Sequence, residues 1–143
     1  MARKSRSNTR TGGARAAAPA RTPEVILDFV FEDGLLFISL ENIGDGPAHD
    51  VRVRFAQDIH GVRGTRSINA LQLFSNTEFL APRKSIRTFL DTSAQYFARK
   101  EPIRITAHLS YLDSARRPYR DTIHHDLGIY QDIGYIRRET SGR

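Results

Sequence analysis

The sequence of 143 residues contains no cysteine and no tryptophan. Without cysteine there can be no disulfide framework, no thiolate metal site and no cysteine nucleophile. No apolar run approaches the roughly 20 residues of a membrane-spanning helix, and the N-terminus lacks the apolar stretch of a secretory signal. The length leaves little room for a second folded domain. The sequence therefore indicates a soluble protein with one core, which is cytoplasmic by default.

Acidic residues are absent from residues 1–23, "MARKSRSNTRTGGARAAAPARTP". Apart from its basic residues, this segment consists mainly of small and polar residues that cannot bury enough apolar surface to offset the entropy of ordering it. We therefore expect a disordered basic arm. The rest of the chain balances its basic residues with all 16 acids, so the formal net charge of +6 belongs to the arm. Its basic residues are Arg3, Lys4, Arg6, Arg10, Arg15 and Arg21.

From residue 24 onward the apolar residues alternate with polar ones, which is typical of half-buried strands. Asp33-Gly34 is a two-residue hairpin signal between the first two strands. Residues 67–74 are predicted to form a strand or a short helical piece, and residues 92–102 a helical turn or long loop capped by Thr92 or Ser93. About seven short strands without a long helical pattern predict an all-β, antiparallel sandwich. The strands are expected at 24–32, 35–43, 51–55, 86–91, 103–112 and 119–130, with a seventh at 67–74 under the first reading.

The segment "NIGDGPA" (42–48) separates the second and third of these strands. We expect its glycines to supply positive φ angles, and Asn42 and Asp45 to form hydrogen bonds within the turn. Pro47 would prevent strand pairing until the next strand begins. The segment is therefore predicted to connect the two sheets.

Three short motifs resemble those of immunoglobulin-like domains from bacterial and archaeal proteins, including the CARDB group. "NIGDGPA" is similar to the N-x-G-x-G-P-A signature of that family, "FLAPRKS" (79–85) to its leucine-x-proline-glycine-glutamate turn, and "YLDSARRPYR" (111–120) to its Y-x-D-x-x-G-R-x-Y-R hairpin. Arg83-Lys84 replaces Gly-Glu, and Ala115 replaces Gly. The resemblance spans residues 25–127 and implies an immunoglobulin-like β-sandwich over 24–130. Such domains bind many partners and seldom catalyse.

Motifs of common enzyme classes are missing. The sequence has no G-x-S-x-G elbow, no G-x-G-x-x-G and no P-loop. Its five histidines lack the spacing that would place two imidazoles on one face of an element, so a metal site would have to combine His108 and His124 with Asp126. Ordinary sheet-surface histidines are the expected alternative. We therefore expect no catalytic residues, no cofactor and no metal.

A basic sheet face is the sharpest functional prediction. In immunoglobulin strand order, the strands over 51–55, 103–112 and 119–130 lie side by side and share an outward face. That face could receive phosphates or an acidic partner. The alternative is a solvated surface neutralised by Asp50, Glu101 and Asp126. The predicted binding residues on this face are Arg52, Arg54, Arg104, His108, Arg120 and His124.

Two classes of function remain open. The first is a non-enzymatic protein-interaction or assembly module whose basic arm contacts an anionic partner. The second is a nucleic-acid-associated or particle-forming, coat-like protein whose arm neutralises phosphates. In either class the arm could instead be only a solubilising tail. Residues 131–143 are expected as a C-terminal edge segment and tail that forms a last edge strand or contacts a neighbouring subunit, so a homo-oligomer is also open.

Overall fold

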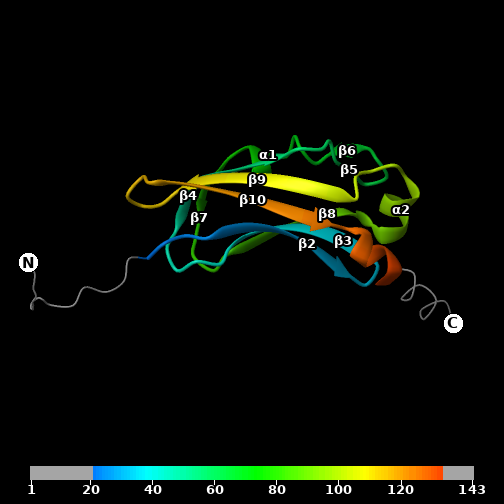
Figure 1. The fold of residues 1–143 in the computed structure, drawn as a ribbon, viewed down its shortest axis with the longest axis horizontal. Coiled ribbons are helices and arrows are strands. Elements are labelled where there is room, and N and C mark those ends of the chain that lie inside the picture. The colour runs from blue at the N-terminus through cyan, green and yellow to red at the C-terminus, as the bar shows by residue number, and fades with distance from the viewer. Residues whose placement is uncertain (1–20, 134–143) are drawn as a thin grey trace, which may run out of the picture.

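The computed structural model describes residues 21–133 and shows two antiparallel sheets packed face to face (Figure 1). One sheet has the order β2, β3, β8 and the other β10, β9, β4, β7, with a small β5–β6 ribbon beside them. The predicted all-β, antiparallel sandwich is confirmed. The three-stranded sheet consists of β2 (Val25–Glu32), β3 (Leu35–Asn42) and β8 (Ser85–Thr92). The four-stranded sheet consists of β4 (Ala48–Phe55), β7 (Thr77–Leu80), β9 (Arg104–Leu112) and β10 (Pro118–Asp126).

The core lies between the sheets because alternate residues of the strands point inward. On β2, Val25, Leu27 and Phe29 are buried, whereas the residues between them are only partly covered. Burial of such apolar side chains contributes about 1.5–3 kcal/mol each, which makes this alternation the main determinant of the fold. The other strands contribute Leu36, Ile38, Leu40, Val51, Val53, Phe55, Leu80, Leu90, Ile105, Ala107, Leu109 and Tyr111 to the same core.

The hairpin between β2 and β3 forms at the predicted residues. Asp33 has φ 53° and Gly34 has φ 79°. Positive φ at both central residues is the signature of a type I′ turn, whose twist matches that of the flanking strands. This hairpin sets the register in which Glu32 pairs with Leu35.

The connection 42–48 joins the two sheets, as predicted, but its glycines serve a different purpose. Within residues 21–133, glycines with positive φ occur only at 34 and 64, so the prediction of positive φ in this connection is wrong. A Cβ on Gly44 would lie 2.6 Å from the Glu24 backbone nitrogen, and one on Gly46 would lie 2.5 Å from the Arg21 carbonyl oxygen. The glycines are therefore needed because the backbone of residues 21–24 runs directly against them.

Asn42 holds this crossing together. Its Oδ1 accepts hydrogen bonds from the backbone N–H groups of Glu24 and Gly44 at 3.1 and 3.0 Å. Its Nδ2 donates to the carbonyls of Gly46 and Leu80 at 2.9 and 3.1 Å. All four hydrogen-bonding positions of the buried amide are thus used. The side chain links the start of β2, the connection and the end of β7.

The region between β4 and β8 contains short elements. β5 (His60–Gly61) pairs with β6 (Arg66–Ser67), and α1 (Gln72–Ser75) follows. Residues 67–74 therefore contain a short helical piece, one of the two alternatives read from the sequence. α2 (Ser93–Ala98) begins as predicted, with the Thr92 hydroxyl accepting a hydrogen bond from the Gln95 backbone N–H.

The last strand ends at Asp126, earlier than the sequence pattern indicates, and residues 128–133 are helical. The alternative of an extended edge strand is therefore wrong for residues 130–133. This helical turn brings the Tyr130 hydroxyl within 2.9 Å of the Phe29 carbonyl, and the His125 Nε2 lies 2.8 Å from the Leu27 carbonyl. Both carbonyls belong to β2, so a side chain of β10 and one of the helical turn after it occupy backbone acceptors of this strand.

Five of the six basic residues of the predicted arm lie outside the described residues. They are Arg3, Lys4, Arg6, Arg10 and Arg15. Arg21 is described and is exposed, with its backbone against Gly46 at the start of the sandwich.

Candidate functional site

The six residues predicted to share a sheet face do so. β9 pairs with β10 on one side and with β4 on the other, so the outward side chains of these three strands form rows across the sheet. In one row, Ser110 of β9 lies between Arg52 and Arg120. In the next row, His108 lies between Arg54 and Thr122. We call the outward side of these strands the basic face. Its predicted binding residues are Arg52, Arg54, Arg104, His108, Arg120 and His124.

The spacing of the arginines follows from sheet geometry. Arg52 and Arg54 are two residues apart on one strand, which separates their Cα atoms by about 7 Å. Arg120 is two strands away from Arg52, or about 10 Å across the sheet. A bulge before Arg52, where Asp50 has φ 51°, sets the parity that turns both β4 arginines outward.

The charges of this face are only partly neutralised. Arg104 forms an ion pair with Asp126 at 3.6 Å. In the part of the chain that the structure describes, no ion pair involves Arg52, Arg54 or Arg120.

The acids expected to neutralise the face mostly pair elsewhere. Asp50 lies 3.7 Å from Arg116, and Glu101 lies 3.6 Å from Arg99. Asp126 alone among the three expected acids forms an ion pair with a residue of the basic face. Asp121, on the edge strand β10, is the one acid among the residues that line a cavity with the unpaired arginines. Three arginines and one aspartate leave this part of the face with a positive excess.

Two histidines of the basic face are held by threonines across the strands. His108 Nδ1 lies 3.1 Å from the Thr122 hydroxyl, and His124 Nδ1 lies 3.0 Å from the Thr106 hydroxyl. When each hydroxyl donates to Nδ1, the proton of the neutral ring sits on Nε2, which then faces away from the threonine as a donor. In that tautomer the histidines add directed N–H groups to the basic face.

A shallow cavity of about 490 Å³ lies on the part of the basic face that contains the unpaired arginines, and neither Arg104 nor His124 lines it. Its wall beside β4 comes from α1, because β7 pairs only with the first half of β4 and leaves the second half to the helix. Phe74 of α1 packs edge-on against Phe55 at 5.2 Å, which fixes the helix there, and Ser75 borders the cavity. The sequence contained no signal for this wall. The polar lining residues are Arg52, Arg54, Ser75, His108, Ser110, Arg120, Asp121 and Thr122.

Two other polar clusters hold loops in place. The Asp113 carboxylate accepts hydrogen bonds from the Arg117 and Ala115 backbone N–H groups and from the Tyr119 hydroxyl. These bonds, that of the Arg117 backbone first, hold the pKa of Asp113 below its usual value. The cluster closes the β9–β10 hairpin, next to one end of the basic face.

The second cluster joins the β5–β6 ribbon to α2. The buried Asp91 carboxylate contacts Arg99 at 2.9 Å and accepts a hydrogen bond from the Arg63 backbone N–H. Arg99 also donates to the His60 carbonyl, and burial raises the pKa of the neighbouring Tyr96. These contacts join separate segments, although the buried Arg99 Nε has no hydrogen-bond partner, so the cluster stabilises the end of the sandwich away from the β9–β10 hairpin.

Residues 21–133 contain no group of three or more histidine, cysteine, aspartate or glutamate side chains arranged to hold a metal ion. His108 and His124 instead bond to threonines, and Asp126 pairs with Arg104. The same residues include no helix that is long and apolar enough to cross a membrane.

Comparison with known proteins gives a family without an assigned role. The model of the family described as "Domain of unknown function (DUF8453)" matches residues 2–131, which is most of the chain. No curated protein and no solved structure matches. The chain belongs to the DUF8453 family.

Proposed function

We propose that this member of the DUF8453 family is a non-enzymatic interaction module that binds an acidic protein partner on its basic face. The observation that carries the proposal is the set of three unpaired arginines, Arg52, Arg54 and Arg120, around one shallow cavity. A guanidinium presents up to five donors in a planar fork and binds carboxylates in a bidentate manner. Because these guanidinium groups form no ion pair within the described residues, their hydrogen-bond donors are available for a ligand.

The spacing of the arginines supports an extended acidic segment as the ligand. Side chains on one side of an extended peptide repeat every two residues, or about 7 Å. Arg52 and Arg54 have the same spacing, so two carboxylates of one strand could each meet one guanidinium. The cavity walls, Ser75 on α1 and Thr122 on β10, offer hydroxyls to the backbone of such a segment.

The composition of the cavity favours a protein over a nucleic acid. Proteins that bind single-stranded nucleic acids commonly stack bases on exposed aromatic side chains. The one phenylalanine, tyrosine or tryptophan ring that borders the cavity is Phe74, which is 0% exposed. The resemblance to bacterial and archaeal immunoglobulin-like domains also supports binding rather than catalysis.

The test is binding of a fluorescent glutamate-rich peptide to the full chain, measured by anisotropy at low salt. We expect the double variant Arg52→Glu with Arg54→Glu to bind at least about tenfold more weakly, because each reversal replaces attraction with repulsion. The matched control is Arg66→Glu with Lys100→Glu. Both residues are exposed and lie off the basic face, so the same change in net charge should cost much less there. Equal losses in the two double variants would refute the proposal.

The acid-free composition of residues 1–23 favours a second candidate, a nucleic-acid-associated or particle-forming protein. A labelled single-stranded oligonucleotide in the same assay tests it. A full-length variant with glutamine at all six basic positions of the arm should then show a flatter dependence of log affinity on log salt. Tight oligonucleotide binding that depends on the arm, combined with no peptide binding, would favour this second candidate over the first.

A further inference from the structure

The outer face of the three-stranded sheet differs in charge from the basic face. The outward residues of β2 and β3 alternate with the buried ones, and they include three acids and several apolar side chains. We call this surface the acidic face. It consists of Ile26, Asp28, Val30, Glu32, Leu35, Phe37 and Glu41, together with Ser85, Arg87 and Phe89 of β8; Ser39 has the same parity but is buried.

Two acids of this face form no ion pair among the residues that the structure describes. Glu32 forms an ion pair with Arg87 at 3.0 Å, and Arg87 also lies 5.0 Å from the centre of the Phe37 ring. Neither Asp28 nor Glu41 takes part in an ion pair within residues 21–133. Glu41 accepts a hydrogen bond from the Ser39 hydroxyl. The strands of the acidic face therefore have a net negative charge.

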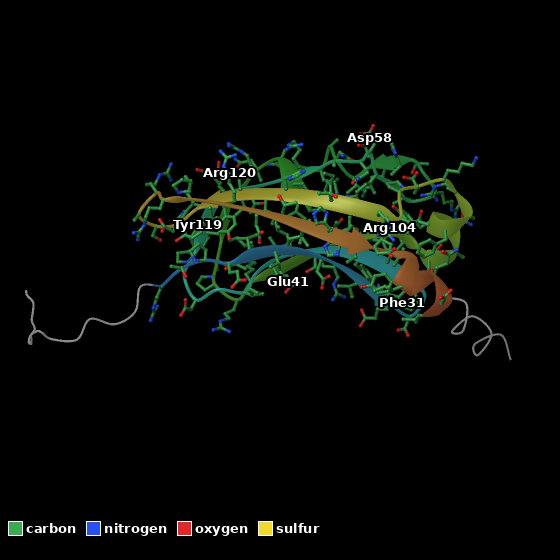
Figure 2. All side chains as sticks on the ribbon, in the orientation of Figure 1. Phe31, Glu41, Asp58, Arg104, Tyr119 and Arg120 are labelled. Atoms are coloured by element: carbon green, nitrogen blue, oxygen red, sulfur yellow. The ribbon has the colours of Figure 1, made fainter. Side chains whose placement is uncertain are left out.

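The two faces are on opposite sides of the sandwich. Glu41 lies along the lower side of the molecule in Figure 2, whereas Arg120 lies along the upper side. Because the faces point away from each other, they cannot neutralise one another within one molecule. They can do so between two molecules.

The spacing of the unpaired charges also matches. Glu41 pairs with Ile26, two residues before Asp28, so Asp28 and Glu41 are diagonal neighbours on adjacent strands. Diagonal neighbours are about 7–8 Å apart, close to the separation of about 7 Å between Arg52 and Arg54. Arg83 and Lys84, on the turn before β8, border Glu41 at one end of the face, whereas Asp28 lies toward its middle.

From this complementarity we propose that the acidic partner of the basic face is the acidic face of a second copy of this chain. The inference rests on the proposed function, since it names the ligand of that same surface. In the contact, Arg52 and Arg54 of one copy meet Asp28 and Glu41 of the next. The apolar side chains of the acidic face, Phe37 among them, are covered by the stems of the arginines.

Such a contact joins two different surfaces, so it leaves one free basic face and one free acidic face at the ends of each dimer. Heterologous contacts of this kind continue into rings when the rotation closes and into open filaments when it does not. The expected assembly therefore grows with protein concentration beyond a dimer, and it weakens with salt because the contact is electrostatic.

The experiment is sedimentation velocity of the full chain at low salt over a series of concentrations. The average mass of the wild-type protein should rise with concentration. Arg52→Glu with Arg54→Glu should weaken association by about a hundredfold, and Asp28→Lys with Glu41→Lys should do the same. The control pair Arg66→Glu with Lys100→Glu should associate much like the wild type. Thermal unfolding of each variant verifies that it is folded.

Mixing the two face variants gives the decisive result. The unchanged acidic face of the first variant can meet the unchanged basic face of the second, so an equimolar mixture should associate although neither variant does so alone. A mixture that remains monomeric, or a wild-type protein that is monomeric at every concentration, would overturn the inference. If the glutamate-rich peptide still distinguishes the basic-face variant in that case, the proposed function stands with a different partner. If the peptide binds the basic-face variant as well as the wild type, the inference and the proposed function both fail.

Discussion

Replacing Asn42 with alanine should destabilise the fold more than any other change in the 42–48 connection. The variant leaves the buried Gly46 and Leu80 carbonyls without the amide that satisfies them. A buried polar group that loses its partner costs about 1–3 kcal/mol. The N–H groups of Glu24 and Gly44 are only part-buried, so each can recover a bond to water at a loss of about 0.5–1 kcal/mol. These terms together span about 3–8 kcal/mol, and we expect a loss toward the lower end, at about 4 kcal/mol.

That loss is measurable by urea unfolding and by thermal melting. For a domain of this size, about 4 kcal/mol corresponds to a fall in Tm of roughly 15 °C. It is also a large part of the total of about 5–15 kcal/mol that stabilises a typical domain.

The control is Asp45→Ala in the same connection. Asp45 is exposed and has no hydrogen-bond partner among the residues that the structure describes. Its replacement should change the free energy of unfolding by less than about 0.5 kcal/mol. An Asn42→Ala variant that loses less than about 1 kcal/mol, or no more than the Asp45 variant, would refute the account of the crossing.

Three further predictions concern single side chains. Gly46→Ala should lower the free energy of unfolding by about 1–3 kcal/mol in urea, because its Cβ would meet the Arg21 carbonyl oxygen at 2.5 Å; an unchanged midpoint would contradict the close approach. Asp113→Asn should be less stable than the wild type at neutral pH, where the carboxylate accepts its hydrogen bonds. The folded pKa of Asp113 is lowered, so the stability that its carboxylate contributes is complete above the usual value of 3.8 and is lost as the pH falls through the folded value. The difference in stability between the two proteins should therefore shrink in acid. A difference that does not change with pH would contradict this role of the carboxylate. Tyr130→Phe should cost about 0.5–1.5 kcal/mol, because its hydroxyl donates to the Phe29 carbonyl at 2.9 Å; equal stability of the two proteins in thermal melting would contradict this role.

Local sequence patterns were enough to predict six of the seven strands of the two sheets, but not β7. The alternation of apolar and polar residues in β2, β4 and β9 predicts which side chains are buried, because a strand turns successive residues to opposite faces. The Asp33-Gly34 pair gives the hairpin because few residues adopt positive φ without strain. Together with immunoglobulin strand order, the same alternation placed Arg52, Arg54 and Arg120 on one face.

Contacts between distant segments could not be read in this way. The glycines of the 42–48 connection were assigned to positive φ because a local rule sees only the turn, whereas their neighbour is the backbone of residues 21–24. The cavity wall needs α1 beside β4, and this depends on β7 being short. The roles of His125 and Tyr130 depend on the sheets meeting at β2. Each of these features requires the three-dimensional arrangement of segments far apart in the chain.

The most direct test of the basic face is a map of backbone amide chemical shifts during titration with the glutamate-rich peptide. The account predicts that the shifts concentrate on residues 52–54, 108–110 and 120–122, which line the cavity, and on the Ser75 end of α1. Shifts confined to residues 1–21, or spread evenly over all exposed arginines, would contradict it.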